Sequence, residues 1–282
     1  QSLINRKDNS VDSLLYDYGQ IIIDECHHIS APNYERLLNE VHAKYILGIT
    51  ATPNRQDGHQ PIIFMQAGPI RHVVASEGNT LIQQVKLSRL QSELPPELRS
   101  EESRPHIADV YRWLMNDDKR NAIIISDILS VVAQQRHPII LTERREHAEL
   151  LGELLLKNGI SFVLLRGAMS AKERALSMAA LDDTQVIVAT GKYIGEGFDL
   201  PKLDTLFLVL PISWKGSLVQ YVGRIQRQFE GKDKVIVFDY LDSALSMLQR
   251  MYQKRAKGYA AMGYTVTEKY EELLQANLVL EQ

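Results

Sequence analysis

Short apolar runs alternate with longer amphipathic segments along almost all of this 282-residue chain. Runs such as Gln20–Ile23, Pro138–Leu141 and Gln185–Ala189 are short and continuously apolar, as is typical of parallel strands covered on both faces. The segments between them have the length and periodicity of helices. This rhythm predicts an α/β fold built on doubly wound parallel sheets.

The rhythm breaks once, and the break predicts two lobes. Residues 91–105 are rich in Ser, Glu and Pro and lack apolar periodicity, so they are the expected linker. We expect a first lobe over residues 1–90, a second lobe over 106–258 and a C-terminal helical extension over 259–282. The first lobe offers only two clear central strands, which is marginal for an independent sheet. We therefore expect this lobe to be truncated on its N-terminal side.

Composition excludes several classes of protein. A formal net charge of −3 excludes a uniformly basic nucleic-acid binder, although a local basic groove stays open. The single cysteine, Cys26, excludes an internal disulfide and a Cys-based zinc site, and we expect it to be a small buried residue. No run approaches the roughly 20 apolar residues of a membrane span. We expect a cytoplasmic protein with no membrane partner.

Acidic residues follow the first strand directly, in the order Asp24-Glu25-Cys26-His27. Ligands of open parallel sheets bind at the carboxyl ends of the strands. One carboxylate there can hold Mg²⁺ through water, and its neighbour can orient or deprotonate an attacking water. An acidic turn that simply ends the strand is the alternative, and this pair alone does not decide between them.

Two further strand ends carry polar loops, Thr50–Pro53 and Thr190–Asp199. Hydroxyls in the first loop can bond the acidic pair, although a threonine-rich strand end stopped by proline is equally simple. Glycines in the second loop can let backbone amides approach a phosphate. A glycine-rich loop is a weak signal, and no stretch of the chain matches the phosphate-binding pattern G-x-x-x-x-G-K-[ST].

A basic segment, Gln220–Arg227, lies in a predicted helix. Arg224 and Arg227 are spaced i, i+3, so on a helix they share a face. Two guanidinium groups on one face suit a polyphosphate whose charge grows in the transition state. A solvated basic helix face is the alternative, but Gly223 within the helical pattern indicates a close backbone approach.

These segments occur in one order, each at a strand end or a helix start, and together they resemble the sequence motifs of superfamily 2 helicases. The resemblance covers about Ile21 to Tyr240. Its parts are Asp24–His27 as the DExH form of motif II, Thr50–Pro53 as motif III, Ile139–Arg144 as motif IV, Leu165–Ser170 with Arg174 as the next element, Thr190–Asp199 as motif V and Gln220–Arg227 as motif VI.

The resemblance implies two RecA-like lobes that hydrolyse ATP between them while the motor moves along nucleic acid. Residues 47–58 are similar to XPB-type and restriction-enzyme-type translocases. The DECH spelling of motif II differs from that of DEAD-box RNA helicases, so DNA is favoured over RNA. XPB-type proteins carry Arg-Glu-Asp where this chain has Arg55-Gln56-Asp57, which puts a strand-separating role of that element in doubt.

The same resemblance implies roles for single residues. Asp24 would serve Mg²⁺ through water, and Glu25 would position the hydrolytic water. His27 and Gln220 would link the lobes across the nucleotide, while Arg224 and Arg227 would act as arginine fingers. The remaining roles are nucleotide binding for Gly195, Glu196, Gly197 and Asp199, coupling for Thr50 and Thr52, and contacts to nucleic-acid phosphates for Thr142, Arg166, Thr190 and Gly191.

The missing phosphate-binding loop is the main departure from the family pattern. We expect that the chain does not hydrolyse ATP at a useful rate without the absent part of its first lobe. The expected ligands and partners are ATP, Mg²⁺, nucleic acid, that absent part and a nuclease domain or subunit. Two other functions remain open: a nucleic-acid-binding module that has lost catalysis, and the motor part of a nuclease or restriction-type defence complex.

Overall fold

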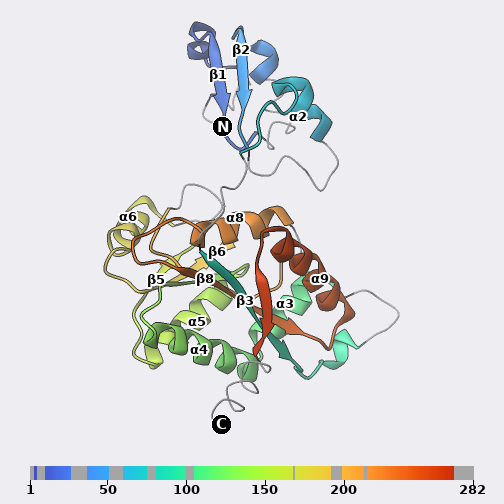
Figure 1. Ribbon diagram of the computed structural model, residues 1–282, viewed down its shortest axis with the longest axis vertical. Helices are drawn as coiled ribbons and strands as arrows, with labels where there is room; N and C mark the ends of the chain where they lie inside the picture. The colour runs from blue at the N-terminus through green and yellow to red at the C-terminus, as the bar shows by residue number, and fades with distance from the viewer. Residues whose placement is uncertain are drawn as a thin grey trace. The chain divides into compact units, whose positions relative to one another are not determined.

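A computed structural model describes the protein over residues 3–4, 10–26, 37–50, 60–74, 81–99, 105–167, 169–191, 199–212 and 215–269. The chain divides into two units, Gln1–Gly78 and Asn79–Gln282, and each unit has its own parallel sheet (Figure 1). None of the helices in the described part is long and apolar enough to span a membrane.

The first unit is built on a two-stranded sheet of β1 (Gln20–Ile23) and β2 (Tyr45–Gly48), the two strands that the sequence predicts. A 3-10 helix, η1 (Ser13–Asp17), precedes β1, and α2 (Gln60–Ala67) follows β2. Ile63, Cys26 and Leu38 form a small core on one face of the sheet. On the other face Ile22 is 60% exposed and Leu47 is 46% exposed.

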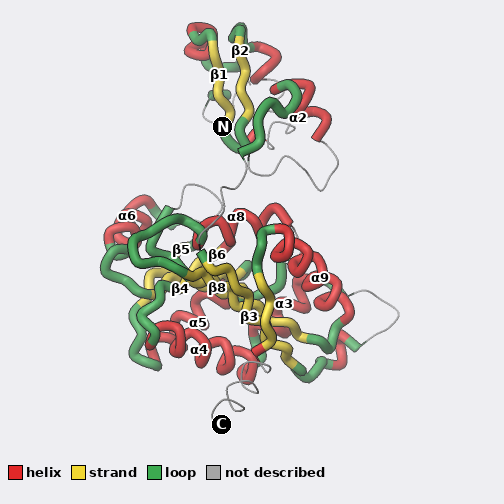
Figure 2. The backbone as a smooth tube through the Cα atoms, viewed as in Figure 1, coloured by secondary structure: helices red, strands yellow, loops and turns green. Residues whose placement is uncertain are grey.

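The second unit contains a seven-stranded sheet in the order β5-β6-β4-β7-β8-β3-β9, in which every neighbouring pair is parallel. Figure 2 shows β5, β6, β4, β8 and β3 of this sheet in yellow. Its strands are β3 (Ile82–Leu90), β4 (Pro138–Thr142), β5 (Phe162–Leu165), β6 (Val186–Thr190), β7 (Thr205–Leu208), β8 (Lys234–Asp242) and β9 (Thr265–Glu268). Its described helices are η3 (Pro96–Leu98), α3 (Ile107–Met115), α4 (Asp118–Ala133), α5 (Arg145–Lys157), α6 (Ala171–Ala179), α8 (Lys215–Ile225) and α9 (Ser246–Ala261).

Helices cover both faces of this sheet (Figure 1). Alternate residues of the central strands pack against α4 and α5 on one face, where Ile140, Val188 and Phe207 are buried. The intervening residues pack against α8 and α9 on the other face. Because both faces are apolar, the central strands consist of continuous apolar runs. The predicted doubly wound α/β architecture is confirmed in this unit.

The boundary between the units differs from the predicted one. β3 falls within the predicted first lobe of residues 1–90, but it pairs with β8 and β9 in the second sheet. The division therefore lies after Gly78. Gln, Lys, Ser and Arg interrupt the apolar residues of β3, so the segment lacks the pattern of a buried strand. It lies next to the short edge strand β9, where polar side chains are tolerated.

The predicted linker of residues 91–105 is also corrected, because its described part packs onto the second unit. The Ser92 hydroxyl donates to Asp242 Oδ1 at 2.8 Å, and the Trp113 indole donates to the Glu93 carbonyl at 3.1 Å. Leu98 is buried in an apolar cluster with residues of α3 and α9. Few apolar side chains suffice to anchor a segment whose polar groups find partners.

The predicted extension of residues 259–282 is corrected over its described part. Tyr259 is fully buried, Tyr264 is 5% exposed, and β9 adds a parallel strand beside β3. The second unit therefore extends at least to Glu268. The charged residues of α9 masked an apolar stripe at helical spacing, formed by Leu248, Tyr252 and Tyr259.

Candidate functional site

In the first unit, hydrogen bonds hold the ends of β1 and β2 side by side. Ile49 N donates to Ile23 O at 2.9 Å, and Cys26 N donates to Ile49 O at 2.9 Å. Asp24 and Glu25 therefore lie beside the chain that continues from β2 into Thr50. The structure brings these three candidates together at the carboxyl ends of neighbouring strands, as the sequence predicts.

Glu25 has a backbone conformation that side chains rarely adopt, with φ of 50°. The Glu25 amide donates to Asp24 Oδ1 at 2.9 Å, so the two residues form a tight turn after β1. Non-glycine residues in such conformations cluster at functional sites. Elsewhere in a protein the strain has no function, and glycine usually occupies the position. This conformation is a functional signal that residue types alone did not carry.

Cys26 is 4% exposed and packs in the small apolar core, which confirms the expectation of a buried residue. Burial raises the pKa of its thiol, and the negative charge of Glu25 raises it further. A Cβ at Gly48 would lie 2.9 Å from Cys26 Sγ, so the core leaves no room for a larger residue there. Cys26 is therefore a packing residue rather than a reactive one.

In the second unit, the carboxyl ends of all described strands lie along one edge of the sheet. β4 leads through α5 to β5 on one side, while β7 leads through α8 to β8 on the other. The chain direction therefore switches between the neighbouring strands β4 and β7. Ligands of doubly wound sheets bind in the crevice at such a point. Thr142, at the end of β4, pairs in register with Thr190, at the end of β6.

Thr142 does not face solvent, which corrects its predicted role in contacting nucleic acid. Its side chain is 1% exposed, and its hydroxyl lies 3.1 Å from His147 Nδ1. The Arg144 amide donates to the same hydroxyl at 3.3 Å. A side chain bonded inward on a central strand cannot reach a phosphate in this conformation. Thr142 instead holds the start of α5.

The other predicted phosphate contacts lie along one path. The Gly167 amide donates to Thr190 Oγ1 at 3.4 Å, which joins the loop after β5 to the end of β6. Arg166, in that loop, has Nη2 3.7 Å from Glu173 Oε1. Gly191 is buried directly after Thr190. These residues remain candidates for binding a nucleic-acid backbone.

The basic segment is only partly helical, and this corrects the predicted shared face of its arginines. α8 carries Gln220 and Arg224 but ends at Ile225, so Arg227 lies beyond it. Arg227 Nε lies 3.1 Å from Asp199 Oδ1, with both side chains half exposed. Lys232 Nζ donates to the Arg227 carbonyl at 2.8 Å, and burial lowers the pKa of Lys232 to about 8.

Gly223 does not mark a close approach of another segment. No heavy atom of the described residues outside its own helix lies within 4 Å of a Cβ built at this position. Gly191 is the crowded glycine instead: its Cβ would lie 2.4 Å from Tyr221 Oη and 2.5 Å from Glu143 Oε1. The helical pattern around Gly223 could not reveal this, because crowding depends on the partner segment.

Three residues that sequence reasoning missed hold the chain before α8. Arg255 on α9 forms two bonds of 2.8 Å to the Asp239 carboxylate, and Tyr259 donates to Asp239 Oδ2 at 2.9 Å. The remaining Arg255 nitrogen donates to the Ile212 carbonyl at 2.8 Å. Arg255 is 2% exposed. Its place in the stripe of Leu248, Tyr252 and Tyr259 was the available signal.

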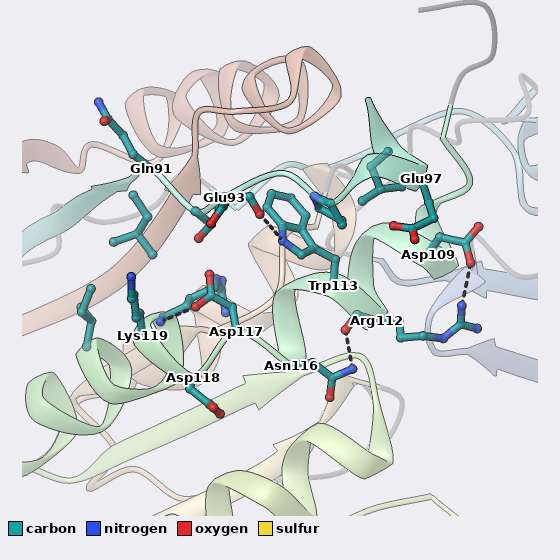
Figure 3. A pocket seen from close by; sticks show the side chains of 16 residues that line it. Gln91, Glu93, Glu97, Asp109, Arg112, Trp113, Asn116, Asp117, Asp118 and Lys119 are labelled. Carbon is teal, nitrogen blue, oxygen red and sulfur yellow. Dashed lines mark hydrogen bonds and ion pairs between the residues drawn. The ribbon is translucent and has the colours of Figure 1, made fainter. Parts of the chain in front are cut away.

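A groove of about 1180 Å³ beside the carboxyl end of β3 contains none of the predicted site residues. Trp113 lies on its wall, with the indole turned toward the Glu93 backbone (Figure 3). Trp113 also packs against the apolar cluster of α3 and α9. Acidic side chains outnumber basic ones on the lining, which disfavours a phosphate ligand: Glu93, Glu97, Asp109, Asp117 and Asp118 against Arg112, Lys119 and Arg120.

Five predicted site residues lie outside the described part of the chain. They are His27, Thr52, Gly195, Glu196 and Gly197.

Comparisons with known proteins agree with the order of these segments. Residues 1–55 match the family described as type III restriction enzyme, res subunit, and residues 118–229 match the helicase conserved C-terminal domain. A protein of Acanthamoeba polyphaga mimivirus, provisionally named ATP-dependent RNA helicase L396, is 27% identical over 269 residues, covering 94% of this chain and 51% of that protein. A protein of Escherichia phage T5, provisionally named helicase D10, is 26% identical over 248 residues, covering 84% and 51%. The chain spans about half the length of these curated relatives.

Solved structures share the fold at low sequence identity. Saccharomyces cerevisiae Dbp5 bound to RNA and ADP BeF3 has a TM-score of 0.56 and 12% identity, covering 91% of this chain and 62% of that one. T4 UvsW has a TM-score of 0.50 and 14% identity, covering 90% and 55%. At these identities the likeness establishes the RecA-like fold alone.

Proposed function

Because this chain belongs with the superfamily 2 helicases, we propose that it forms part of a motor that hydrolyses ATP to move along nucleic acid. The observation that carries the proposal is the ion pair between Arg227 and Asp199. The two residues come from segments that the sequence marks independently as phosphate-handling. Their ion pair brings the two segments together, which supports a role in one shared nucleotide site.

The first unit supplies the groups that act on water and metal in this proposal. Asp24 is exposed at the end of β1, and a single exposed carboxylate suits a Mg²⁺ ion that keeps most of its waters. When bound, ATP would supply the phosphate bond to be cleaved, and Mg²⁺ would neutralise part of the charge of its phosphates. Glu25 orients the attacking water. The strained turn at Glu25 supports this role, since it fixes the direction of the side chain.

The second unit supplies the cationic groups. Arg224 and Arg227 stabilise the charge that grows on the phosphates, and Gln220 contacts the nucleotide, as does His27 of the first unit. The further nucleotide contacts are Gly195, Glu196, Gly197 and Asp199. Opening of the Arg227–Asp199 pair would free Arg227 for the nucleotide. Thr50 and Thr52 couple the nucleotide state to the opposite side of the first sheet.

The nucleic acid contacts Arg166, Thr190 and Gly191 through its phosphates, so binding does not depend on sequence. We propose DNA as the preferred substrate, because motif II reads DECH and residues 47–58 are similar to duplex-DNA translocases. The name of the mimivirus relative makes RNA the competing substrate. The match of residues 1–55 to a restriction-enzyme subunit favours a second candidate function, the motor part of a nuclease complex.

The test is the ATPase activity of the full-length protein with duplex DNA, single-stranded DNA or RNA. We expect duplex DNA to stimulate hydrolysis and Glu25→Gln to lower the stimulated rate by roughly 100-fold or more, as for loss of a catalytic base. Glu153→Gln, at an exposed position on α5, is the matched control and should keep full activity. Stimulation by RNA and not by DNA would mean that RNA is the substrate. A lack of stimulation by every nucleic acid would refute the proposal that the protein is a motor.

A further inference from the structure

Three chain segments meet at Gly191, and the contact is too close for any side chain. A Cβ at this position would lie 2.4 Å from Tyr221 Oη and 2.5 Å from Glu143 Oε1. Glu143 follows β4, Gly191 follows β6, and Tyr221 lies on α8. The Gly191 backbone is therefore in contact with the side chains of both other segments.

A hydrogen bond joins the two side chains at this junction. The Tyr221 hydroxyl donates to Glu143 Oε1 at 3.3 Å, and Tyr221 is only 7% exposed. Burial raises the pKa of Tyr221, and the Glu143 carboxylate raises it further, so the hydroxyl stays a donor at physiological pH. The bond then persists unless one of the two segments moves.

Glu143 also faces a second tyrosine. Its charge contributes, after burial, to raising the pKa of Tyr111 to about 12. The Tyr111 hydroxyl donates to the Pro211 carbonyl at 2.7 Å, and the Arg144 guanidinium lies 5.3 Å from the Tyr111 ring centroid. Tyr111 is thus held in place by its own bond to Pro211, and a shift of Gly191 would act directly on the Glu143–Tyr221 bond.

The junction of Glu143, Gly191 and Tyr221 lies between two groups of candidate residues within the second unit. On one side, Gly191 continues from Thr190, which is bonded to the loop of Arg166. On the other side, Tyr221 is followed one helical turn later by Arg224 and preceded directly by Gln220. A movement at Thr190 or Gly191 is therefore transmitted by contact to the helix that carries the candidate nucleotide-binding side chains.

We propose that Glu143 and Tyr221 are positioning residues that couple nucleic-acid binding at Thr190 and Gly191 to the placement of Gln220 and Arg224. This inference rests on the proposed motor function. Neither residue touches ATP or nucleic acid in the proposal. Their bond transmits the presence of one ligand to the site of the other, so its loss uncouples two activities that each remain intact.

The test uses Tyr221→Phe, Glu143→Met and the double variant in the full-length protein, because Tyr221→Phe removes the donor and Glu143→Met removes the acceptor of the bond. Three quantities are measured: the ATPase rate without nucleic acid, the affinity for labelled duplex DNA or RNA without ATP, and the ATPase rate at saturating nucleic acid. We expect each single variant to keep the first two and to lose roughly fivefold or more of the stimulation, the size typical of coupling between sites. The double variant should lose no more than either single variant, because both remove the same bond.

Tyr240→Phe is the matched control. Tyr240 is also buried and also donates to a carboxylate, Asp127 Oδ2 at 3.0 Å, but it lies on the face of the sheet covered by α4. The Tyr240→Phe variant should have a lower melting temperature and should keep the stimulation of ATPase activity by nucleic acid. Full stimulation in both single variants, additive losses in the double variant or an equal loss in Tyr240→Phe would each overturn the inference. A wild-type protein without stimulation would instead refute the motor itself, and the coupling with it.

Discussion

A buried chain of hydrogen bonds connects β4 to the start of α4 through one histidine. His147 is fully buried, with Nδ1 3.1 Å from Thr142 Oγ1 and Nε2 3.2 Å from Asn121 Oδ1. The Asn121 amide nitrogen donates to the Met115 carbonyl, so its oxygen faces the ring as an acceptor. Nε2 therefore carries the proton of a neutral imidazole, and Nδ1 accepts from the Thr142 hydroxyl.

This neutral histidine makes stability depend on pH. Burial, aided by the positive charge of Arg120, lowers the pKa of His147 from 6.5 to about 3. Between these values the unfolded chain binds a proton that the folded chain does not, so stability is complete above pH 6.5 and falls as pH decreases. The expected slope from this group is roughly 1.4 kcal/mol per pH unit.

His147→Gln should therefore flatten the loss of stability between pH 6.5 and pH 4, as measured by urea midpoints across that range. The matched control is Thr142→Val, which keeps the imidazole and should keep the slope while lowering stability at every pH. An unchanged slope in His147→Gln would contradict the assignment of a buried neutral imidazole.

At the scale of elements, α9 supports the chain that leads into α8. Asp239 on β8 is 1% exposed, and its charge is balanced by Arg255, which also bonds the Ile212 carbonyl. The desolvation cost of a buried pair offsets much of its attraction, so the pair adds little net stability. Removal of one partner is much more costly, because it leaves the other charge buried alone.

Arg255→Met should destabilise the protein by about 3–5 kcal/mol, because Asp239 then lacks its counter-charge. Combining it with Asp239→Leu should recover part of the loss, although Tyr259 and the Ile212 carbonyl stay without a partner. Arg250→Met, on an exposed part of the same helix, should change stability by less than about 0.5 kcal/mol. Urea unfolding measures all three, and a small effect of Arg255→Met would show that the pair is hydrated.

At the scale of the whole molecule, the two units differ in how their sheets are protected. β1 and β2 form a sheet in which each strand has one unpaired edge in the described structure, and Ile22 and Leu47 are exposed on one face. β4, β6 and β7 are flanked by strands on both sides and covered on both faces. Protection from local opening follows burial and pairing of the backbone.

Hydrogen–deuterium exchange of the 282-residue chain should therefore be faster in β1 and β2 than in β4, β6 and β7. Mass spectrometry of peptides that cover residues 20–26 and 45–50 measures the first group, and peptides over 138–142, 186–190 and 205–208 measure the second. Equal protection of the two groups would mean that the exposed face of the first sheet is covered in solution.

Local sequence patterns predicted most of the secondary structure. The predicted strands Pro138–Leu141 and Gln185–Ala189 and the predicted helix that contains Gln220 are present, with ends that differ by a few residues, because their apolar runs and periodicities are properties of adjacent residues. β3, α2 and β9 were missed. β3 was the costly omission, since pairing with residues about 150 positions away decides which unit it joins, and its own composition carries no mark of that partner.

The candidate site divides in the same way. The sequence alone reveals the order of the motifs, the acidic pair after β1, the glycine loop after β6 and the basic segment of α8. Chemistry at strand ends needs particular residue types next to one another in the chain. The tertiary structure alone decided that Thr142 turns inward, that Arg227 leaves the helix to pair with Asp199, and that Arg255 is buried. Burial and close contact depend on residues distant in the chain, so no local pattern determines them.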